Sequence, residues 1–531
     1  MADRSMNVFS FWGKVSAVQK ALLITLLGLA LRLYFFTGIS SADDLSVAGA
    51  AFKLMDGGPY LPEGHYDARI GMSYPLAGIF ALFGVGDIQM AVIPLLASMA
   101  AALLTFLITR KMAGDSAALF AVFAVAIFPL DVFYASQFMP DGLLGVLLAG
   151  AMYAAIRAVE AEAHSMRWAA LAGLLWGYSY LVKIEAAFLL FPLAVLYLQR
   201  RANWAAGFMT AAACALFVVG ENLAYYAQSG EVLYRIKAMA GSTQMVTRAE
   251  FSGEQLWIFP KAWFLTFYQF SLHYYLLFAG IVWVLVVRQR QLYIVVTWVL
   301  VYLLWLQFGA NPFAEEFSFK SHLTRYCEML LVPACILIGA FCNFLMEWRP
   351  KLSAAFTAGW SAVSLFLIAF NFLSAERELA SKRMLAELGA EITGTIYMDS
   401  GSHSLATFYT RKGQVPYSLD LFQKHDFSTG ETQVISPADI EGYIFYNRAF
   451  VEFRQNRYFM KGLSVDEIDA HCMREKVVSN PAPAVSYASA QALNFIATYI
   501  PVAALSEKIS HTTSSLLEGD DVLLWKCGGY A

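Results

Sequence analysis

The chain has 531 residues, of which 59% are hydrophobic and 15% charged, and its mean hydropathy is +0.54. Soluble globular proteins carry about 25% charged residues, so this composition indicates a protein whose surface largely faces lipid. The formal net charge of −3 argues against nucleic acid as a partner, because phosphate binding needs a basic surface.

Apolar segments long enough to cross a membrane recur along the first 375 residues. A span needs about 20 mostly apolar residues, and on this criterion we predict about eleven spans. The stretch up to Lys20 leads directly into the first of them, so we predict no cleavable signal. The spans lie near residues 20–38, 87–109, 116–135, 139–156, 168–182, 185–199, 203–221, 268–287, 291–308, 326–347 and 354–374.

Basic residues fall in every second short loop between these spans. By the positive-inside rule, those loops and the amino terminus face the cytoplasm. The other loops and everything after residue 375 then face outward. We therefore predict a multi-pass protein of the plasma membrane, the inner membrane in a bacterium, with a periplasmic C-terminal domain. The orientation rests on Arg110, Lys111, Arg157, Arg167, Arg200, Arg201, Arg288, Arg290, Arg349 and Lys351.

Two outward loops are long, at residues 39–86 and 222–262. In the first, apolar residues recur at helical spacing, which indicates an amphipathic helix on the membrane surface. The following apolar segment Tyr74–Phe83 is too short to span and is interpreted as a second surface or re-entrant helix. The apolar stripe of the first helix consists of Leu45, Ala48, Phe52 and Met55.

The predicted fold is an α-helical membrane domain, residues 1–375, followed by a soluble α/β domain, residues 376–531. The second part has ordinary soluble composition and carries short apolar runs typical of strands. Its two cysteines, Cys472 and Cys527, would lie on the oxidising side, where a disulfide can form, but the sequence leaves their pairing open. The predicted strands include residues 395–398, 443–446 and 522–525.

Polar side chains of both signs gather at the outward ends of the spans, whereas the cytoplasmic ends carry mainly basic anchors. A charge near the bilayer centre costs about 2.5–3.5 kcal/mol, so such residues are functional candidates. A structural protein has little reason to collect both signs at one surface. The outward set is Asp43, Asp44, Asp131, Asp141, Lys183, Glu185, Glu221, Asn222, Lys320, His322 and Arg325.

The acidic members have simple structural interpretations beside the catalytic one. Asp43 and Asp44 begin the amphipathic helix and could cap it, or one could deprotonate an acceptor hydroxyl. Asp141 follows a proline at the start of a span and could also be a first-turn acid. Glu185 fits a local ion pair, and Glu221 fits a packing role or loop anchoring as well as it fits catalysis.

The basic members lie on the side that the positive-inside rule depletes of cations, so they are either membrane anchors or part of a binding site. Lys183 could be an interfacial anchor, and Arg69 in the first outer loop could simply be solvated. Lys320 and His322 precede Arg325 at the start of a late span. This outward basic group favours an anionic ligand over a snorkelling anchor.

One reaction fits an acidic pair and cations on the side that lacks nucleotide sugars. A polyprenyl phosphate sugar brings its own leaving group, a lipid phosphate that needs cations rather than a general acid. The acceptor hydroxyl needs a carboxylate base, for which Asp43 is the first candidate and Asp44 the second. A single displacement of this kind inverts the anomeric carbon.

The first outer loop resembles the signature of the GT-C glycosyltransferases. The resemblance is carried by Ser41-Ala42-Asp43-Asp44-Leu45 and by Lys53-Leu54-Met55-Asp56-Gly57-Gly58-Pro59-Tyr60. Similar relatives are protein O-mannosyltransferases, aminoarabinose transferases acting on lipid A and bacterial transferases that add uronic acids to lipopolysaccharide. Less specific similarity continues to about residue 375, in Tyr74-Pro75-Leu76, Gln137–Asp141, Gly173–Pro192 and Arg325-Tyr326.

The resemblance implies that Asp43 is the catalytic acid with Asp44 as its neighbour, that Asp141 is a second acid, and that cations lie near the lipid phosphate. The chain has Asp44 where relatives often have Glu, and Met72-Ser73-Tyr74-Pro75 where many have His-Pro-Pro. Some relatives bind a divalent metal at the acidic cluster, and the ligand set here does not decide this. The substrate-binding candidates are Arg69, Tyr74, Lys183, Glu185, Glu221, Lys320, His322 and Arg325.

The leading hypothesis is an inverting glycosyltransferase with an undecaprenyl-type phosphate donor and a glycolipid, polysaccharide or protein acceptor in the cell envelope. One alternative is a transporter or channel for a lipid-linked or small anionic solute. Another is a non-catalytic protein that binds a lipid-linked glycan.

Overall fold

The computed structural model describes residues 15–40, 43–160, 163–199, 204–243, 256–309, 323–388, 392–411, 416–425, 432–448, 451, 463–478, 484–498, 506–507, 510, 513 and 522–528. Of the residues named above, Ser41, Ala42, Arg200, Arg201, Lys320 and His322 lie outside these residues.

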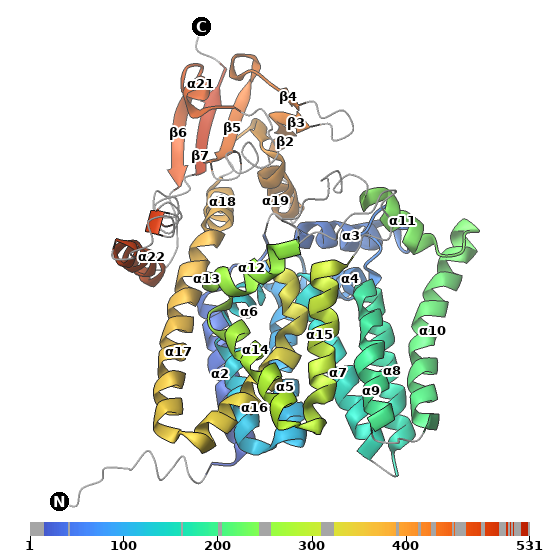
Figure 1. Ribbon diagram of the computed structural model, residues 1–531. Helices are drawn as coiled ribbons and strands as arrows, with labels where there is room; N and C mark the ends of the chain where they lie inside the picture. The colour runs from blue at the N-terminus through green and yellow to red at the C-terminus, as the bar shows by residue number, and fades with distance from the viewer. Residues whose placement is uncertain are drawn as a thin grey trace, which may run out of the picture.

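A bundle of apolar helices forms the larger part of the molecule (Figure 1). Among the described residues, seven helices are long and apolar enough to cross a membrane. The predicted α-helical multi-pass class is thereby confirmed. These helices are α2 (Ala17–Tyr34), α5 (Asp87–Ala126), α7 (Pro140–Glu160), α10 (Trp204–Ser229), α15 with its first turn η3 (Arg290–Phe308), η4 with α16 (Thr324–Trp348) and α17 (Pro350–Asn371).

Each predicted span coincides with one of these helices or with a shorter one. Two predicted spans form the single element α5, which is interrupted at Gly114, where φ is +87°. A glycine tolerates this left-handed conformation, so the chain can turn there without steric cost. The remaining helices are α8 (Ser165–Val182), η1 (Ile184–Leu189), α9 (Leu190–Gln199) and α14 (His273–Val287).

Short helices lie across one end of the bundle, as Figure 1 shows for α3, α4 and α12. They are α3 (Asp43–Gly57), α4 (Ile70–Phe83), α6 (Pro129–Tyr134), α11 (Tyr234–Thr243), α12 (Ile258–Leu265) and α13 (Phe267–Phe270). Asp43 and Asp44 occupy the first turn of α3, where a negative charge interacts favourably with the helix dipole.

The apolar stripe predicted for α3 is only partly correct. Ala48 and Phe52 are buried as expected, but Met55 is 43% exposed. Val47 and Ala51 are buried instead, so the packed face turns toward α4 and the bundle rather than lying along the stripe. The difference arises because α3 is packed on more than one side and is not a helix with a single lipid-facing stripe.

A mixed sheet lies beyond the same end of the bundle (Figure 1). Its strand order is β2-β1-β5-β7-β6, with β1 parallel to β2 and β5, and β7 antiparallel to β5 and β6. The three predicted strands are confirmed as parts of β1 (Gly394–Met398), β5 (Gly442–Asn447) and β7 (Val522–Cys527). The sheet's other strands are β2 (Tyr417–Leu421) and β6 (Cys472–Val478), while β3 (Gln423–His425) and β4 (Thr432–Val434) pair with each other in a separate two-stranded sheet.

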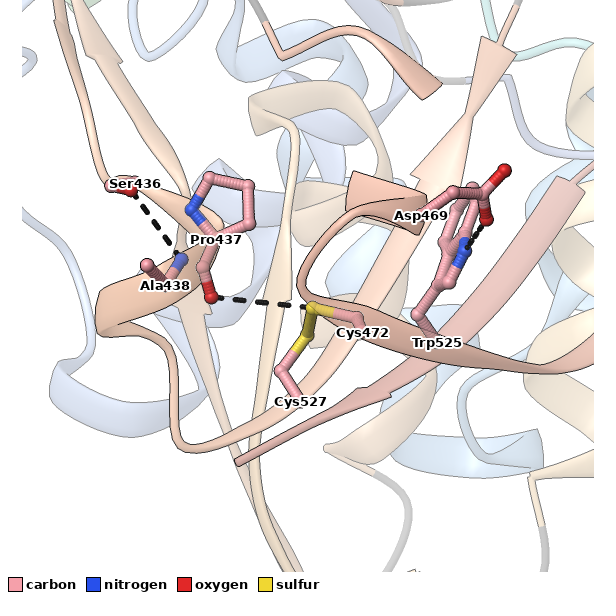
Figure 2. Close-up of a disulfide and its surroundings, with 7 residues drawn as sticks. All are labelled: Ser436, Pro437, Ala438, Asp469, Cys472, Trp525 and Cys527. Carbon is pink, nitrogen blue, oxygen red and sulfur yellow. Dashed lines mark hydrogen bonds between the residues drawn. A yellow bond between two sulfur atoms is a disulfide. The ribbon is translucent and has the colours of Figure 1, made fainter. Parts of the chain in front are cut away.

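Cys472 and Cys527 form a disulfide between paired positions of β6 and β7 (Figure 2). Near this disulfide, the indole of Trp525 in β7 donates a hydrogen bond of 2.7 Å to Asp469. The helices around the sheet are α18 (Glu376–Glu387), α19 (Ser400–Thr410), α21 (Val465–Asp469) and α22 (Ala484–Ala497).

The sheet's helices dock directly on the first outer loop. Asp87, at the start of α5, accepts hydrogen bonds from Lys382 of α18 at 2.7 Å, from Tyr409 of α19, and from the backbone of Ile39 at 2.8 Å. Phe408 of α19 packs against Phe52 of α3. These contacts hold the start of α3 between the bundle and the sheet.

Candidate active site

Asp43 is held at the start of α3 by two donors from distant parts of the chain. The hydroxyl of Tyr66 donates to its Oδ1, and the guanidinium of Arg325 donates to its Oδ2. Burial raises the pKa of Asp43, but the guanidinium groups of Arg325 and Arg69 and the two hydrogen bonds outweigh burial and leave this pKa below its usual range. Asp43 is therefore an ionised carboxylate at neutral pH.

Arg325 links the two acids of the site. It lies in η4 (Thr324–Leu330), a short 3₁₀ segment that leads into α16. Besides its bond to Asp43, its Nε lies 3.9 Å from Oδ2 of Asp141, at the start of α7. The 3₁₀ turn and the first turn of α7 thus bring Arg325 and Asp141, which are 184 positions apart, to one place. Arg325 Nη1 also contacts the sulfur of Met139 at 3.4 Å.

Lys183 completes a buried cluster with Asp141. Its Nζ donates to Oδ1 of Asp141 at 2.7 Å and lies 3.6 Å from Oε1 of Glu185. The ammonium also lies 4.2 Å from the ring centre of Tyr326, which is within the range of a cation–π contact. The backbone leaves helical geometry at Lys183, between α8 and η1, and this break directs the side chain toward α7.

Three polar atoms of this cluster have no hydrogen-bond partner in the described part of the chain. They are Oδ2 of Asp141, Nε of Arg325 and Nη1 of Arg69. An unsatisfied buried donor or acceptor costs about 1–3 kcal/mol, so folding alone does not account for this arrangement. The two guanidinium nitrogens without hydrogen-bond partners are suited to an anionic group such as a phosphate.

Asp44 has a separate environment, although it is the next residue. It is fully buried and accepts hydrogen bonds from the backbone N–H of Ser40 at 2.5 Å, the hydroxyl of Ser40 at 3.0 Å and the N–H of Leu45 at 2.9 Å. Burial raises its pKa to about 7, against the lowering effect of these donors. These bonds tie the preceding loop to α3.

The remaining predicted site residues divide into two groups. Arg69 stacks on Tyr66, with its Cζ 5.1 Å from the ring centre, and so belongs to the Asp43 cluster. Tyr74 is 48% exposed on α4. Glu221 forms a buried ion pair at 3.1 Å with Arg235, which also donates to the carbonyl of Tyr180. Glu221 is thereby engaged in joining α10 to α8 and α11.

Some residues of the site escaped the sequence analysis. Tyr66 and His65, whose rings are tilted by 40° against each other, lie in a loop without periodicity, and only its position in the first outer loop could have drawn attention to them. Glu328 is buried one turn after Arg325, and a methyl group on Gly142 of α7 would lie 3.4 Å from its Oε2. In the sequence, an acid that follows Arg325-Tyr326 so closely and precedes an apolar run could have been recognised as a site candidate.

The described residues contain no group of three or more His, Cys, Asp or Glu side chains that could hold a metal ion. Within the cluster, Arg325 lies between the carboxylates of Asp43 and Asp141, where a shared cation would have to bind.

Comparison with known proteins identifies the architecture. Residues 68–225 match the family of dolichyl-phosphate-mannose-protein mannosyltransferases. The crystal structure of ArnT from Cupriavidus metallidurans bound to undecaprenyl phosphate has a TM-score of 0.54 and 13% identity, covering 85% of this chain and 95% of that one. The protein has the GT-C fold.

The apo structure of the same ArnT agrees with this assignment, with a TM-score of 0.52, 13% identity, and coverage of 82% of this chain and 94% of that one. No curated protein matches the sequence. The fold that the resemblance to the GT-C glycosyltransferases implies is thus confirmed, and the family match covers residues 68–225. The matched family segment includes Asp141 and Lys183, whereas Asp43 and Arg325 lie outside it.

Proposed function

We propose that this GT-C protein is an inverting glycosyltransferase that moves a sugar from an undecaprenyl-type phosphate to a hydroxyl of a cell-envelope acceptor. The observation that carries the proposal is the arrangement around Arg325. An ionised carboxylate, Asp43, lies beside Arg325 and Arg69, each of which has one buried nitrogen without a hydrogen-bond partner in the described part of the chain. The ArnT structure with bound undecaprenyl phosphate supports a lipid phosphate as the ligand of such a group.

In the proposed reaction, the acceptor hydroxyl attacks the anomeric carbon while its proton passes to Asp43. The bond from this carbon to the phosphate oxygen breaks, and the electron pair leaves with the polyprenyl phosphate. Arg325 and Lys183 stabilise the charge that grows on the phosphate. Asp43 then releases the proton to water, and the sugar is transferred with inversion.

Asp141 has a positioning role in this scheme. Its carboxylate holds Lys183 at 2.7 Å and faces Nε of Arg325, so it orients both cations. Asp44 fixes the start of α3 through Ser40 rather than acting as a base. This division favours Asp43 as the general base.

The site belongs, in this proposal, on the periplasmic side of the bacterial inner membrane. The sheet and helix α3, whose first turn contains Asp43, lie at the same end of the bundle (Figure 1). A disulfide in that domain supports an oxidising compartment, where nucleotide sugars are scarce and a lipid-linked donor is needed. The acceptor is an envelope glycolipid such as lipopolysaccharide.

The substitution Asp43→Asn tests the proposed base. Wild-type and variant genes are expressed in a strain that lacks the gene, and envelope glycolipids are compared by mass spectrometry. Loss of a base typically costs about 10²–10⁴-fold in rate, so the sugar restored by the wild type should be nearly absent with the variant. Asp115→Asn, which makes the same change at an exposed position, is the matched control and should restore the sugar.

Two results would contradict the proposal. Normal transfer by a correctly inserted Asp43→Asn protein would remove Asp43 as the base. If the purified wild type carried a small anionic solute into liposomes and transferred no sugar, the alternative of a transporter would replace the enzyme.

A further inference from the structure

A groove beside α3, lined by both polar and apolar atoms, has no part in the chemistry described so far. It has a volume of about 420 Å³. One of its walls reaches the catalytic carboxylate, because Tyr66 lines the groove while its hydroxyl donates to Oδ1 of Asp43. We call it the α3 groove, and its lining residues are Ser46, Gly49, Ala50, Lys53, Gly64, His65, Tyr66 and Asp67.

The floor of the α3 groove is one face of the helix with small side chains. Ser46, Gly49, Ala50 and Lys53 follow each other at helical spacing and so lie on one side of α3. A Cβ atom at Gly49 would meet nothing within 4 Å. The space above this glycine is therefore open, and a ligand can approach the helix backbone there.

The charges of the groove do not suit an anion. The ammonium of Lys53 is already paired, at 2.9 Å with Asp67 and at 3.1 Å with Glu63. Burial, together with the charge of Arg69, lowers the pKa of His65 to about 4, so this ring is neutral at physiological pH. The groove thus offers hydrogen-bonding groups with no excess positive charge, unlike the cluster around Lys183 and Arg325.

The two oxygens of Asp43 separate these environments. Oδ2 is bound by Arg325 of the cationic cluster, and Oδ1 is bound by Tyr66 of the α3 groove. An inverting displacement brings the acceptor and the leaving phosphate to opposite faces of the anomeric carbon. The groove is therefore the place from which an acceptor hydroxyl reaches the base while the phosphate lies with the cations.

We propose that the α3 groove binds the saccharide portion of the acceptor and presents one hydroxyl to Asp43. This inference rests on the proposed glycosyltransferase function. The paired charges of Lys53 and Asp67, the rings of His65 and Tyr66, and the open space at Gly49 fit the face of a sugar ring, which carries hydroxyl groups beside apolar C–H groups. A peptide acceptor would bind instead at an exposed strand edge or in apolar side-chain pockets, which these lining residues do not form.

The substitution Gly49→Leu fills the groove without removing a contact. Leucine is a better helix former than glycine, so α3 itself should not be weakened. The matched control is Gly57→Leu, in the last turn of the same helix, where a Cβ atom also meets nothing within 4 Å and which does not line the groove. Purified full-length proteins are assayed with an extracted polyprenyl phosphate sugar donor and with lipopolysaccharide from a strain lacking the gene.

Gly49→Leu is expected to raise the KM for lipopolysaccharide at least tenfold, while its Kd for undecaprenyl phosphate changes less than twofold. Gly57→Leu should match the wild type in both. In Asp43→Asn protein, which binds without turnover, lipopolysaccharide should slow hydrogen exchange at residues 64–67.

An unchanged KM for Gly49→Leu beside an active wild type would overturn the groove assignment and leave the enzyme function intact. A protein acceptor whose KM rises in Gly49→Leu, with no use of lipopolysaccharide, would overturn the saccharide class. Failure of the wild type to transfer any sugar would instead refute the proposed function on which the inference rests.

Discussion

Asp43 and Asp44 are adjacent in the sequence and have opposite electrostatic environments. Burial raises the pKa of both carboxyls, but two guanidinium groups reverse the effect at Asp43, whereas only hydrogen bonds and the more distant Lys382 oppose it at Asp44. Neighbouring acids with pKa values displaced in opposite directions commonly have different roles. Asp43 is ionised at neutral pH, whereas Asp44 fixes the loop before it through Ser40.

The raised pKa of Asp44 predicts a pH dependence of stability. Its folded value of about 7 exceeds the ordinary 3.8, so the folded protein binds more protons than the unfolded chain between these values. The contribution of Asp44 to the free energy of unfolding is fully present below about pH 4 and is lost as the pH rises toward 7, which lowers this free energy by a few kcal/mol. Relative to Asp44→Asn, the apparent melting temperature of the wild type should therefore fall between pH 5 and pH 7.5.

The measurement is a thermal unfolding series of both proteins in the same detergent. Any hydrogen bond that asparagine fails to make with Ser40 lowers the stability of the variant equally at each pH, so only the change of the difference with pH is informative. A constant difference from pH 5 to pH 7.5 would show that Asp44 does not titrate there.

Individual side chains differ in how far one sequence can assign them. Asp43 stands out because an acidic pair opens a surface helix beside an apolar span. Its partner Tyr66 does not, because a hydrogen bond across a loop leaves no periodic pattern. For Glu221, the buried partner Arg235 supplies the anchoring role that the sequence analysis weighed against catalysis.

Helix α3 is held between the membrane bundle and the outer sheet by three phenylalanines from three elements. The ring centres of Phe52 and Phe80 are 5.4 Å apart, and Phe408 of α19 lies 6.0 Å and 6.2 Å from them. Arg411 adds a cation–π contact with Phe52 at 4.1 Å and an ion pair with Asp56. The chain after the last span thus contributes directly to the placement of α3, which carries the proposed base.

Removing the contribution of α19 should loosen α3. Phe408→Ala is expected to cost about 3–5 kcal/mol of packing, because this ring is buried between the two parts. Amide hydrogen exchange across α3 should become faster, and the transfer rate should fall with little change in the strands of the sheet. Phe495→Ala, at a ring that is 63% exposed on α22, is the control and should leave α3 unchanged.

The informative readout is the comparison between α3 and β5. Faster exchange in β5 alone would mean that Phe408 stabilises only its own domain. Equal exchange of α3 in Phe408→Ala and the wild type would show that the docking contact does not position the helix.

Helices and strands could be predicted here, but their docking could not. Apolar runs marked the seven described helices that are long and apolar enough to cross a membrane, and short apolar runs marked three strands of the sheet. The hydrogen bonds from Lys382 and Tyr409 to Asp87 join residues 295 and 322 positions apart, and neither the residue types nor their spacing predicts these contacts. The burial of α3 on several sides likewise depends on elements that the local pattern does not contain.

Basic turns and the disulfide lie at opposite ends of the molecule. The turns that join α14 to α15 and α16 to α17 lie at the end opposite the sheet, and these turns carry Arg288, Arg290, Arg349 and Lys351 (Figure 1). The sheet with its disulfide lies at the other end with the Asp43 cluster. The positive-inside rule and the preference of disulfides for oxidising compartments therefore favour the same orientation independently.

Cysteine labelling tests this orientation directly. Ser404 of α19 and Gln289 between α14 and α15 are both exposed, and they lie on opposite sides in the proposed topology. In spheroplasts, a membrane-impermeant maleimide should label Ser404→Cys and spare Gln289→Cys, whereas both should react after detergent is added. The wild type, whose cysteines outside the disulfide are buried or half-buried, sets the background. Labelling of Gln289→Cys alone would place Asp43 in the cytoplasm, where nucleotide sugars are available and the reason for a lipid-linked donor disappears.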